Sequence, residues 1–201
     1  MRFNEHTLPD HNGNILVKTF HSKVLPEKRI YKEHHHTECE LSLFISGSGI
    51  YRVCDREYSF SPGDMFLFGS NETHCITQIN EELNLLNIYF NPRILWESSE
   101  SVILLRLFSA RSKTFSNKFF AKDETLKNII LNTEKEMTDM DCGYTLQVRY
   151  MLFSALTHIM RTYDYTHNES FLAKNTSVTA KLREAVNYID ENLFKPVRVS
   201  L

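Results

Sequence analysis

From position 15 to about position 90, apolar and polar residues alternate in short runs that Gly, Pro, Asn and Asp separate. Alternation rich in β-branched and aromatic residues, bounded by turn residues, is typical of strands with one buried face. The pattern predicts about eight strands, with the bodies ILVKTFHSKVL, RIYKEHHH, CELSLFIS, GIYRVC, REYSF, DMFLF, HCITQI and LNLLNIYF. No helical pattern lies between them, so we expect an antiparallel barrel or jelly roll.

The pattern becomes helical after Asn91. Pro92 can begin a short helix, and the run SVILLRLF suits a helix that packs on the barrel. Residues 123–140 place apolar positions three and four apart, and Asp123 suits the start of that helix. A second helical pattern follows Gly143 over residues 144–165, so the two helices are expected to form a hairpin. The first helix has the predicted inner face Leu126, Ile129, Ile130, Thr133 and Met137.

The last part of the sequence predicts a linker and one more helix. Residues 164–177 are polar and rich in turn residues, which indicates a linker. Residues 178–201 then carry a helical pattern that Pro196 ends. Its apolar face has no predicted partner, so we interpret this helix as the start of a domain that the sequence does not complete. The predicted class is α+β: a barrel with an N-terminal arm (1–91), a helical dimerisation segment (92–163), the linker and the stray helix.

Composition and charge narrow the function. The chain has 201 residues, of which 42% are hydrophobic, enough for a full core and a smaller appendage. A net charge of -2 gives no basic surface for nucleic acid. No signal-like segment begins the chain, and no apolar run approaches the ~18 residues that a membrane span needs. We therefore expect a cytoplasmic protein whose four cysteines are free thiols.

Three consecutive histidines, at positions 34 to 36, precede a predicted strand. Because alternate residues of a strand share a face, His34, His36 and Glu40 are expected on one side and His35 on the other. Imidazole nitrogens and one carboxylate bind Zn, Ni, Fe or Mn and leave coordination positions open. The segment therefore predicts a candidate site for a divalent transition metal.

The spacing of this segment resembles the first motif of the cupin barrels: His-x-His, then three residues, Glu40, six residues and Gly47. The second cupin motif resembles the segment from Gly63 to His74, in which Gly69 stands where cupins have proline and Asn71 where they have a second glycine. The resemblance implies a metal site made of the set His34, His36, Glu40 and His74.

A longer stretch, HHHTECELSLFISGSGIYRVCDREYSFSPGDMFLFGSNETHCI, resembles the sensor domain of the AraC family of bacterial transcription regulators. TEKEMTDMDCGYTLQVRYMLFSALTHIMRTY is similar to that family's two-helix dimerisation segment, and LREAVNYIDENLFKPVRVSL to the first helix of its helix-turn-helix DNA-binding domain. The resemblance implies a ligand-sensing and dimerisation part, a homodimer, and contact with DNA only through a C-terminal domain absent here.

Three roles stay open for the histidine and glutamate set. It can hold a metal, contact an organic effector such as a sugar, or be hydrogen-bonded inside the barrel mouth. Phe44 and Tyr51 are predicted to contact the effector, although such aromatic residues are also common in cores. Further aromatic residues that can stack on an effector are Tyr31, Phe66, Phe68 and Tyr89.

The second helix of the hairpin is apolar over more than one face. We predict a homodimer seam here, with plain hairpin core as the alternative. The predicted seam residues are Leu152, Leu156, Ile159 and Tyr163. No P-loop, dinucleotide fingerprint or Ser-His-Asp order occurs, so we predict that the chain is not an enzyme. The alternative is a small metal-dependent cupin enzyme of dioxygenase or isomerase type.

Overall fold

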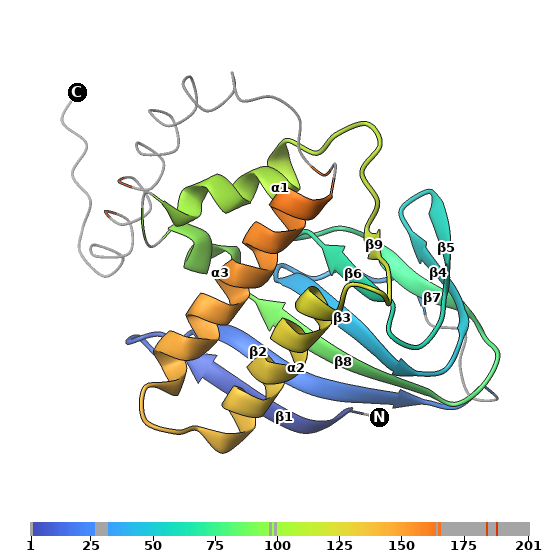
Figure 1. Ribbon diagram of the computed structural model, residues 1–201, viewed down its shortest axis with the longest axis horizontal. Coiled ribbons are helices and arrows are strands. Elements are labelled where there is room, and N and C mark those ends of the chain that lie inside the picture. Colours follow the sequence, from blue (N-terminus) through green and yellow to red (C-terminus); the bar gives the residue numbers. More distant parts are fainter. Residues whose placement is uncertain are drawn as a thin grey trace.

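The computed structural model describes residues 2–26, 32–96, 98, 100–163, 165, 184 and 188. Two antiparallel sheets pack face to face, and helices cover the outer face of the larger sheet (Figure 1). The strands are β1 (Arg2–Pro9), β2 (Ile15–Val24), β3 (Cys39–Ser46), β4 (Gly49–Val53), β5 (Arg56–Phe60), β6 (Met65–Phe68), β7 (His74–Ile79), β8 (Leu83–Phe90) and β9 (Lys118–Phe119). The helices are η1 (Pro92–Trp96), η2 (Ser101–Leu105), α1 (Arg106–Ser109), α2 (Glu124–Asp139) and α3 (Tyr144–Thr162).

Hydrogen bonds join the strands into two sheets rather than one closed barrel. The six-stranded sheet has the order β1-β2-β8-β3-β6-β9, and the three-stranded sheet has the order β5-β4-β7. Every strand pair is antiparallel. The fold is therefore the predicted α+β, cupin-like jelly roll, with the correction that its barrel is open.

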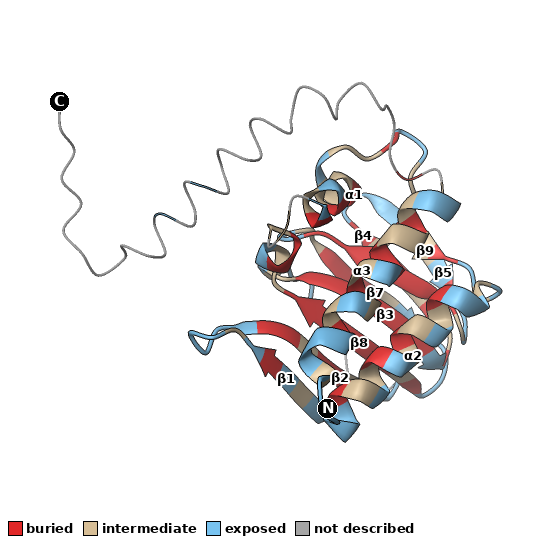
Figure 2. Cartoon of the chain, turned by 60° about the vertical axis from the view of Figure 1, so that its left-hand side comes forward, coloured by how far each residue is buried: buried red, intermediate tan, exposed pale blue. Residues whose placement is uncertain are grey.

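The larger sheet is buried on both faces, as strand β3 shows. Cys39, Leu41 and Leu43 belong to the core between this sheet and the helices. The alternate residue Phe44 belongs to a second core between the two sheets. Figure 2 shows the resulting band of buried residues under α2 and α3. A ligand site between the sheets therefore lies one strand layer away from the helices.

The helical hairpin forms as the sequence predicts, but its interior differs. Asp123 caps α2 by accepting a hydrogen bond from the backbone N–H of Leu126 at 3.0 Å. Leu152, Leu156 and Ile159 of α3 are at most 2% exposed and pack in the core of their own chain. The prediction that these three side chains form a seam between two chains is wrong, because no surface of theirs is left for a partner.

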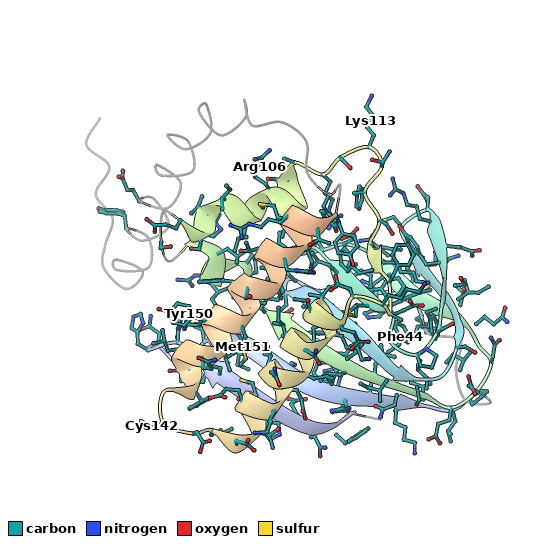
Figure 3. The ribbon with its side chains drawn as sticks, in the orientation of Figure 1. Phe44, Arg106, Lys113, Cys142, Tyr150 and Met151 are labelled. Atoms are coloured by element: carbon teal, nitrogen blue, oxygen red, sulfur yellow. The ribbon has the colours of Figure 1, made fainter. Side chains whose placement is uncertain are left out.

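Tyr163, the fourth predicted seam residue, also binds within the chain. It is partly buried, and its hydroxyl donates a hydrogen bond of 2.7 Å to the Asp123 carboxylate. The exposed apolar residues of α3 are instead Leu146, 55% exposed, and Tyr150, 60% exposed. Figure 3 labels Tyr150 on this helix.

Three further differences concern the elements. The N-terminal arm contains strand β1, which pairs with β2. The strand predicted over residues 29–36 appears, in its described part, only as an isolated bridge between His34 and His74. The two short helices after Pro92 include 3-10 turns, η1 and η2. The predicted linker and the predicted helix over 178–201 fall outside the described residues, save for single positions.

Among the described helices, none is long and apolar enough to span a membrane.

Candidate functional site

Three of the four predicted metal ligands meet at one point. His36 lies in the loop before β3, Glu40 lies in β3, and His74 begins β7. Their ligand atoms all lie within 4.8 Å of one another. Nε2 of His36 is 3.0 Å from a Glu40 carboxylate oxygen, and Nε2 of His74 is 3.4 Å from the same oxygen.

His74 is held so that one ring nitrogen faces the cluster. Its Nδ1 lies 2.7 Å from the backbone oxygen of Glu72, which leaves Nε2 directed at Glu40. The ring stacks on Phe68, with centroids 4.4 Å apart and planes 10° apart. The residue is 1% exposed, and among the described residues Nε2 has no partner with hydrogen-bond geometry. A buried ring nitrogen without a hydrogen-bond partner is uncommon, and a metal ion is one partner that would satisfy it.

The loop that carries His36 is fixed from three sides. The His36 ring stacks on Tyr89 with centroids 4.4 Å apart, and its Nδ1 lies 2.9 Å from the backbone oxygen of Glu38. The backbone N–H of Asn71 donates to the His36 carbonyl at 2.7 Å. Asn71 has φ +60°, a conformation that Asn tolerates better than most residues. This explains how Asn can stand where the cupin motif has glycine.

The cluster is electrostatically coupled. Burial alone would raise the pKa of Glu40, but the hydrogen bond from His36, the adjacent His74 ring and the Ser42 hydroxyl hold it well below the usual range. Burial alone would lower the pKa of His74, but the Glu40 carboxylate raises it. The carboxylate is therefore anionic, and its charge is largely taken up by its own neighbours.

The fourth predicted ligand, His34, lies beside the cluster rather than in it. Its ring centroid is 4.5 Å from that of His74, but its Nδ1 lies 3.3 Å from the backbone oxygen of Lys32 and its side chain is exposed. Partial burial and the charge of His74 lower the pKa of His34. His35 is exposed and outside the cluster, as predicted.

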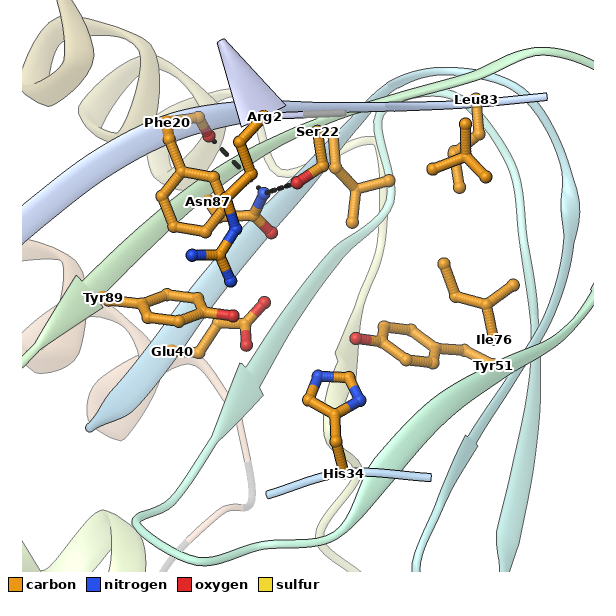
Figure 4. A pocket seen from close by; sticks show the side chains of 12 residues that line it. Arg2, Phe20, Ser22, His34, Glu40, Tyr51, Ile76, Leu83, Asn87 and Tyr89 are labelled. Carbon is orange, nitrogen blue, oxygen red and sulfur yellow. Dashed lines mark hydrogen bonds between the residues drawn. The ribbon is translucent and has the colours of Figure 1, made fainter. Parts of the chain in front are cut away.

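A cavity of about 280 Å³ opens next to the cluster, between the two sheets (Figure 4). Glu40 belongs to both the cluster and the cavity wall. The volume is just below the usual range for ligand pockets, about 300 to 1,000 Å³, and suits a small ligand. The lining residues are Arg2, Phe20, Ser22, Val24, His34, Glu40, Tyr51, Ile76, Leu83, Leu85, Asn87 and Tyr89.

A hydrogen-bonded row on neighbouring strands supports one wall of the cavity. The Ser42 hydroxyl donates to Glu40 and lies 3.1 Å from Asn87 Oδ1. The Asn87 amide nitrogen in turn lies 3.2 Å from the Ser22 hydroxyl. Asn87 is 3% exposed, so its polar atoms are fixed by the protein before any ligand arrives.

Of the two aromatic residues predicted to contact the effector, one lines the cavity and the other does not. Tyr51 lines the cavity, and so does Tyr89. Phe44 does not line it: the ring is fully buried and stacks on Phe60 with centroids 4.0 Å apart, so it is a core residue (Figure 3). Phe66 and Phe68 lie in the same core, and Tyr31 falls outside the described residues.

The cavity also contains residues that the sequence did not indicate, foremost Arg2, Phe20, Ser22 and Asn87. For Asn87 a signal exists, because a polar residue in the run LNLLNIYF needs a buried partner if the strand is covered on both faces. For Arg2 the sequence carries no such signal, because the N-terminal arm that contains it was not predicted to be a strand.

The donor set fits a divalent transition metal. Two imidazole nitrogens and one carboxylate oxygen converge, and the unpartnered Nε2 of His74 points at the common centre. Such a set leaves further coordination positions open. A metal held there by His36, Glu40 and His74 would supply a Lewis acid at the edge of the cavity.

Comparison with known proteins gives relatives for part of the chain. The HTH-type transcriptional activator RhaR of Salmonella arizonae is 35% identical over 66 residues, which are 33% of this chain and 23% of that protein. RhaR of Escherichia coli is 33% identical over 66 residues, with the same shares. The chain thus matches less than a quarter of the length of these relatives.

Solved cupin structures superpose on part of the chain. A cupin superfamily protein from Desulfitobacterium hafniense superposes with a TM-score of 0.37 at 14% identity, over 45% of this chain and 78% of that one.

The family of AraC-like ligand binding domains matches residues 23–156. Because this match covers more than half of the sequence, the chain belongs to the family of AraC-like ligand binding domains.

Proposed function

We propose that the chain is the sensor part of an AraC-type transcription regulator, and that a small organic effector binds in the cavity between the sheets. The cavity is the observation that supports this proposal: it combines polar side chains fixed by hydrogen bonds with an apolar end. The matched relatives are named transcriptional activators. Because the chain matches 23% of their length, contact with DNA is assigned in this proposal to a helix-turn-helix domain outside the described residues.

The fold offers a route from the cavity to the helices. Strands β2, β3 and β8 present Phe20, Glu40 and Asn87 to the cavity, and their opposite faces belong to the core under α2 and α3. A ligand that binds one arrangement of these strands more tightly than another shifts the position of the helices. This is the coupling that the proposed sensor needs.

The second candidate function is metal binding at His36, Glu40 and His74. The unpartnered nitrogen of His74 favours it. The metal would be Zn, Ni, Fe or Mn by the donor set. A metal-dependent cupin enzyme needs the same cluster, but the family match supports a sensor, and we propose no catalytic activity.

We also propose that the sensor is a homodimer, with a seam different from the predicted one. The buried residues of α3 are occupied within the chain, whereas Leu146 and Tyr150 are exposed and lie one helical turn apart. They are therefore the apolar residues of this helix that a second chain can reach.

The proposed function is tested by a thermal-shift screen of sugars and small organic acids, followed by calorimetry. A ligand at a hundred times its Kd stabilises the protein by about 2.7 kcal/mol. Tyr89→Phe removes one hydroxyl from the cavity and should weaken binding, whereas Tyr150→Phe removes the same group from an exposed site and should not. Equal binding by both variants would place the ligand elsewhere.

A further inference from the structure

One cation, Arg2, lines the cavity, and a second, Lys18, lies beside the lining rings of Phe20 and Tyr89 without being a lining residue itself. The Arg2 guanidinium lies 4.4 Å from the centre of the Phe20 ring and 5.9 Å from that of Tyr89. The Lys18 ammonium lies 5.4 Å and 5.6 Å from the same two rings. Among the residues that the structure describes, neither cation forms an ion pair, so only aromatic faces stabilise them.

The nearby carboxylates are already engaged. Glu40 receives hydrogen bonds from Ser42 and His36. Glu38 is 3.8 Å from the His36 ring nitrogen and also accepts from the Thr37 hydroxyl. Among the described residues, neither carboxylate forms an ion pair with Arg2 or Lys18, so both cations can receive an anionic ligand.

The opposite end of the cavity is apolar. Figure 4 shows the Arg2 guanidinium reaching from β1 toward Tyr89 and Glu40, while Leu83 and Ile76 lie at the other end. Val24 and Leu85 complete the apolar lining. A ligand that fills both ends must be charged at one end and apolar at the other.

The aromatic faces are covered, which argues against a sugar that stacks on them. Arg2 lies over the Phe20 ring, and the His36 ring stacks on Tyr89 at 4.4 Å. A neutral sugar would therefore find these two rings already in contact with other side chains, and it would leave both cations without a partner. A guanidinium instead matches a carboxylate by two parallel hydrogen bonds.

We infer that the cavity takes a small organic carboxylate whose anionic head meets Arg2 and Lys18 and whose apolar chain lies against Val24, Ile76, Leu83 and Leu85. This inference rests on the proposed sensor function and names the chemical class of its effector. Arg2 and Lys18 act as specificity-determining residues, because they distinguish the acid from its neutral analogue.

The test is calorimetric titration of the whole chain, with any tag at the C-terminus and a chelator in the buffer so that metal does not contribute. The probes are butanoate, hexanoate and octanoate, with hexanamide as the neutral analogue of hexanoate. We expect affinity to rise about fourfold for each methylene from butanoate to hexanoate. Hexanamide should bind about tenfold or more weakly than hexanoate.

Variants separate the local charge from the overall charge. Arg2→Gln should weaken hexanoate binding about tenfold or more, and Lys18→Gln should weaken it as well. Lys23→Gln is the matched control: it removes one positive charge from the same strand as Lys18, but Lys23 alternates to the other face of β2 and pairs with Glu82 at 2.7 Å. Hexanoate affinity should be unchanged in this variant.

The inference is overturned if hexanamide binds as tightly as hexanoate, or if Arg2→Gln binds hexanoate like the unaltered chain. It is also overturned if no carboxylate binds at millimolar concentration. If a neutral sugar then stabilises the chain and Tyr89→Phe abolishes the effect, the carboxylate inference fails while the proposed sensor function stands. If neither a carboxylate nor a neutral sugar binds, both the carboxylate inference and the proposed sensor function fail.

Discussion

Nε2 of His74 is the atom that distinguishes a metal-binding cluster from a cluster held by hydrogen bonds alone. It is buried, faces Glu40, and has no hydrogen-bond partner among the described residues. A metal ion would satisfy it, and so would a water molecule. Because ligating imidazoles must be neutral and the carboxylate charged, metal binding would also change the protonation of the cluster.

Elemental analysis of tag-free protein measures metal occupancy directly. If the cluster holds a metal, we expect about one ion per chain, loss of that ion in His74→Ala, and a lower melting temperature after chelation. His35→Ala should keep the metal, because His35 is exposed and outside the cluster. Less than about a tenth of an ion per chain would contradict metal binding and leave the three residues as a hydrogen-bonded cluster beside the cavity.

Single residues show what the sequence can and cannot predict about this site. His36, Glu40 and His74 were predicted from the resemblance to the spacing of the cupin motifs, and the structure brings these three together. His34 does not join them, since the segment before β3 is not a strand and strand alternation does not apply there. Arg2 escapes prediction because its position depends on the pairing of β1 with β2, a contact between distant residues.

At the scale of elements, Asp123 joins the two long helices. Its carboxylate caps α2, lies 2.8 Å from Nε2 of His158 in α3, and accepts from the Tyr163 hydroxyl. Asp123→Ala removes all three contacts and should lower the free energy of unfolding by about 2 kcal/mol, as urea denaturation would show. Glu124→Ala, at the exposed next position, should change it by about 0.5 kcal/mol or less. Equal effects of the two changes would refute this role.

The same carboxylate predicts a pH dependence. Burial alone would raise the pKa of Asp123, but the Leu126 N–H, Tyr163 and His158 lower it below the unfolded value of about 3.9. A carboxyl group with a depressed folded pKa stabilises above the unfolded pKa, and this contribution is lost as pH falls through the folded pKa. Asp123→Asn should therefore lose less stability than the unaltered chain when urea unfolding is compared between about pH 5 and pH 2. Parallel pH curves would contradict the account.

Helix α3 has an inner and an outer apolar set with different expected effects. Leu156 is fully buried, so Leu156→Ala should lower the free energy of unfolding by about 3 kcal/mol without changing the association state. Tyr150→Asp lies on the exposed face and should convert a dimer to a monomer with little effect on stability. Light scattering measures the association state of each variant, and urea denaturation measures its free energy of unfolding. A monomer in the unaltered chain at micromolar concentration would end the dimer proposal.

Elements were predictable where the local pattern agrees with the tertiary environment. The run CELSLFIS gave β3 with its observed bounds, because Gly47, at φ +90°, ends it in a turn. The polar run RFNEHTLP gave no strand signal, since only Leu8 is buried and the register shifts near Asn4. The α3 pattern predicted a helix correctly but could not say whether its apolar residues face the same chain or another.

At the scale of the whole molecule, the six-stranded sheet separates two cores. One lies under the helices and the other between the sheets, where polar and aromatic side chains together line the cavity. This arrangement places the proposed effector one strand layer from the helices. The account therefore expects ligand binding to change α2 and α3 through the sheet rather than by direct contact.

The most direct test of the central claim is a crystal structure of the chain with the tightest-binding compound from the screen. The account predicts density in the cavity between Arg2, Glu40 and Tyr89, with the apolar part of the compound against Leu83 and Ile76. A compound bound on another surface, with only solvent in the cavity, would contradict it.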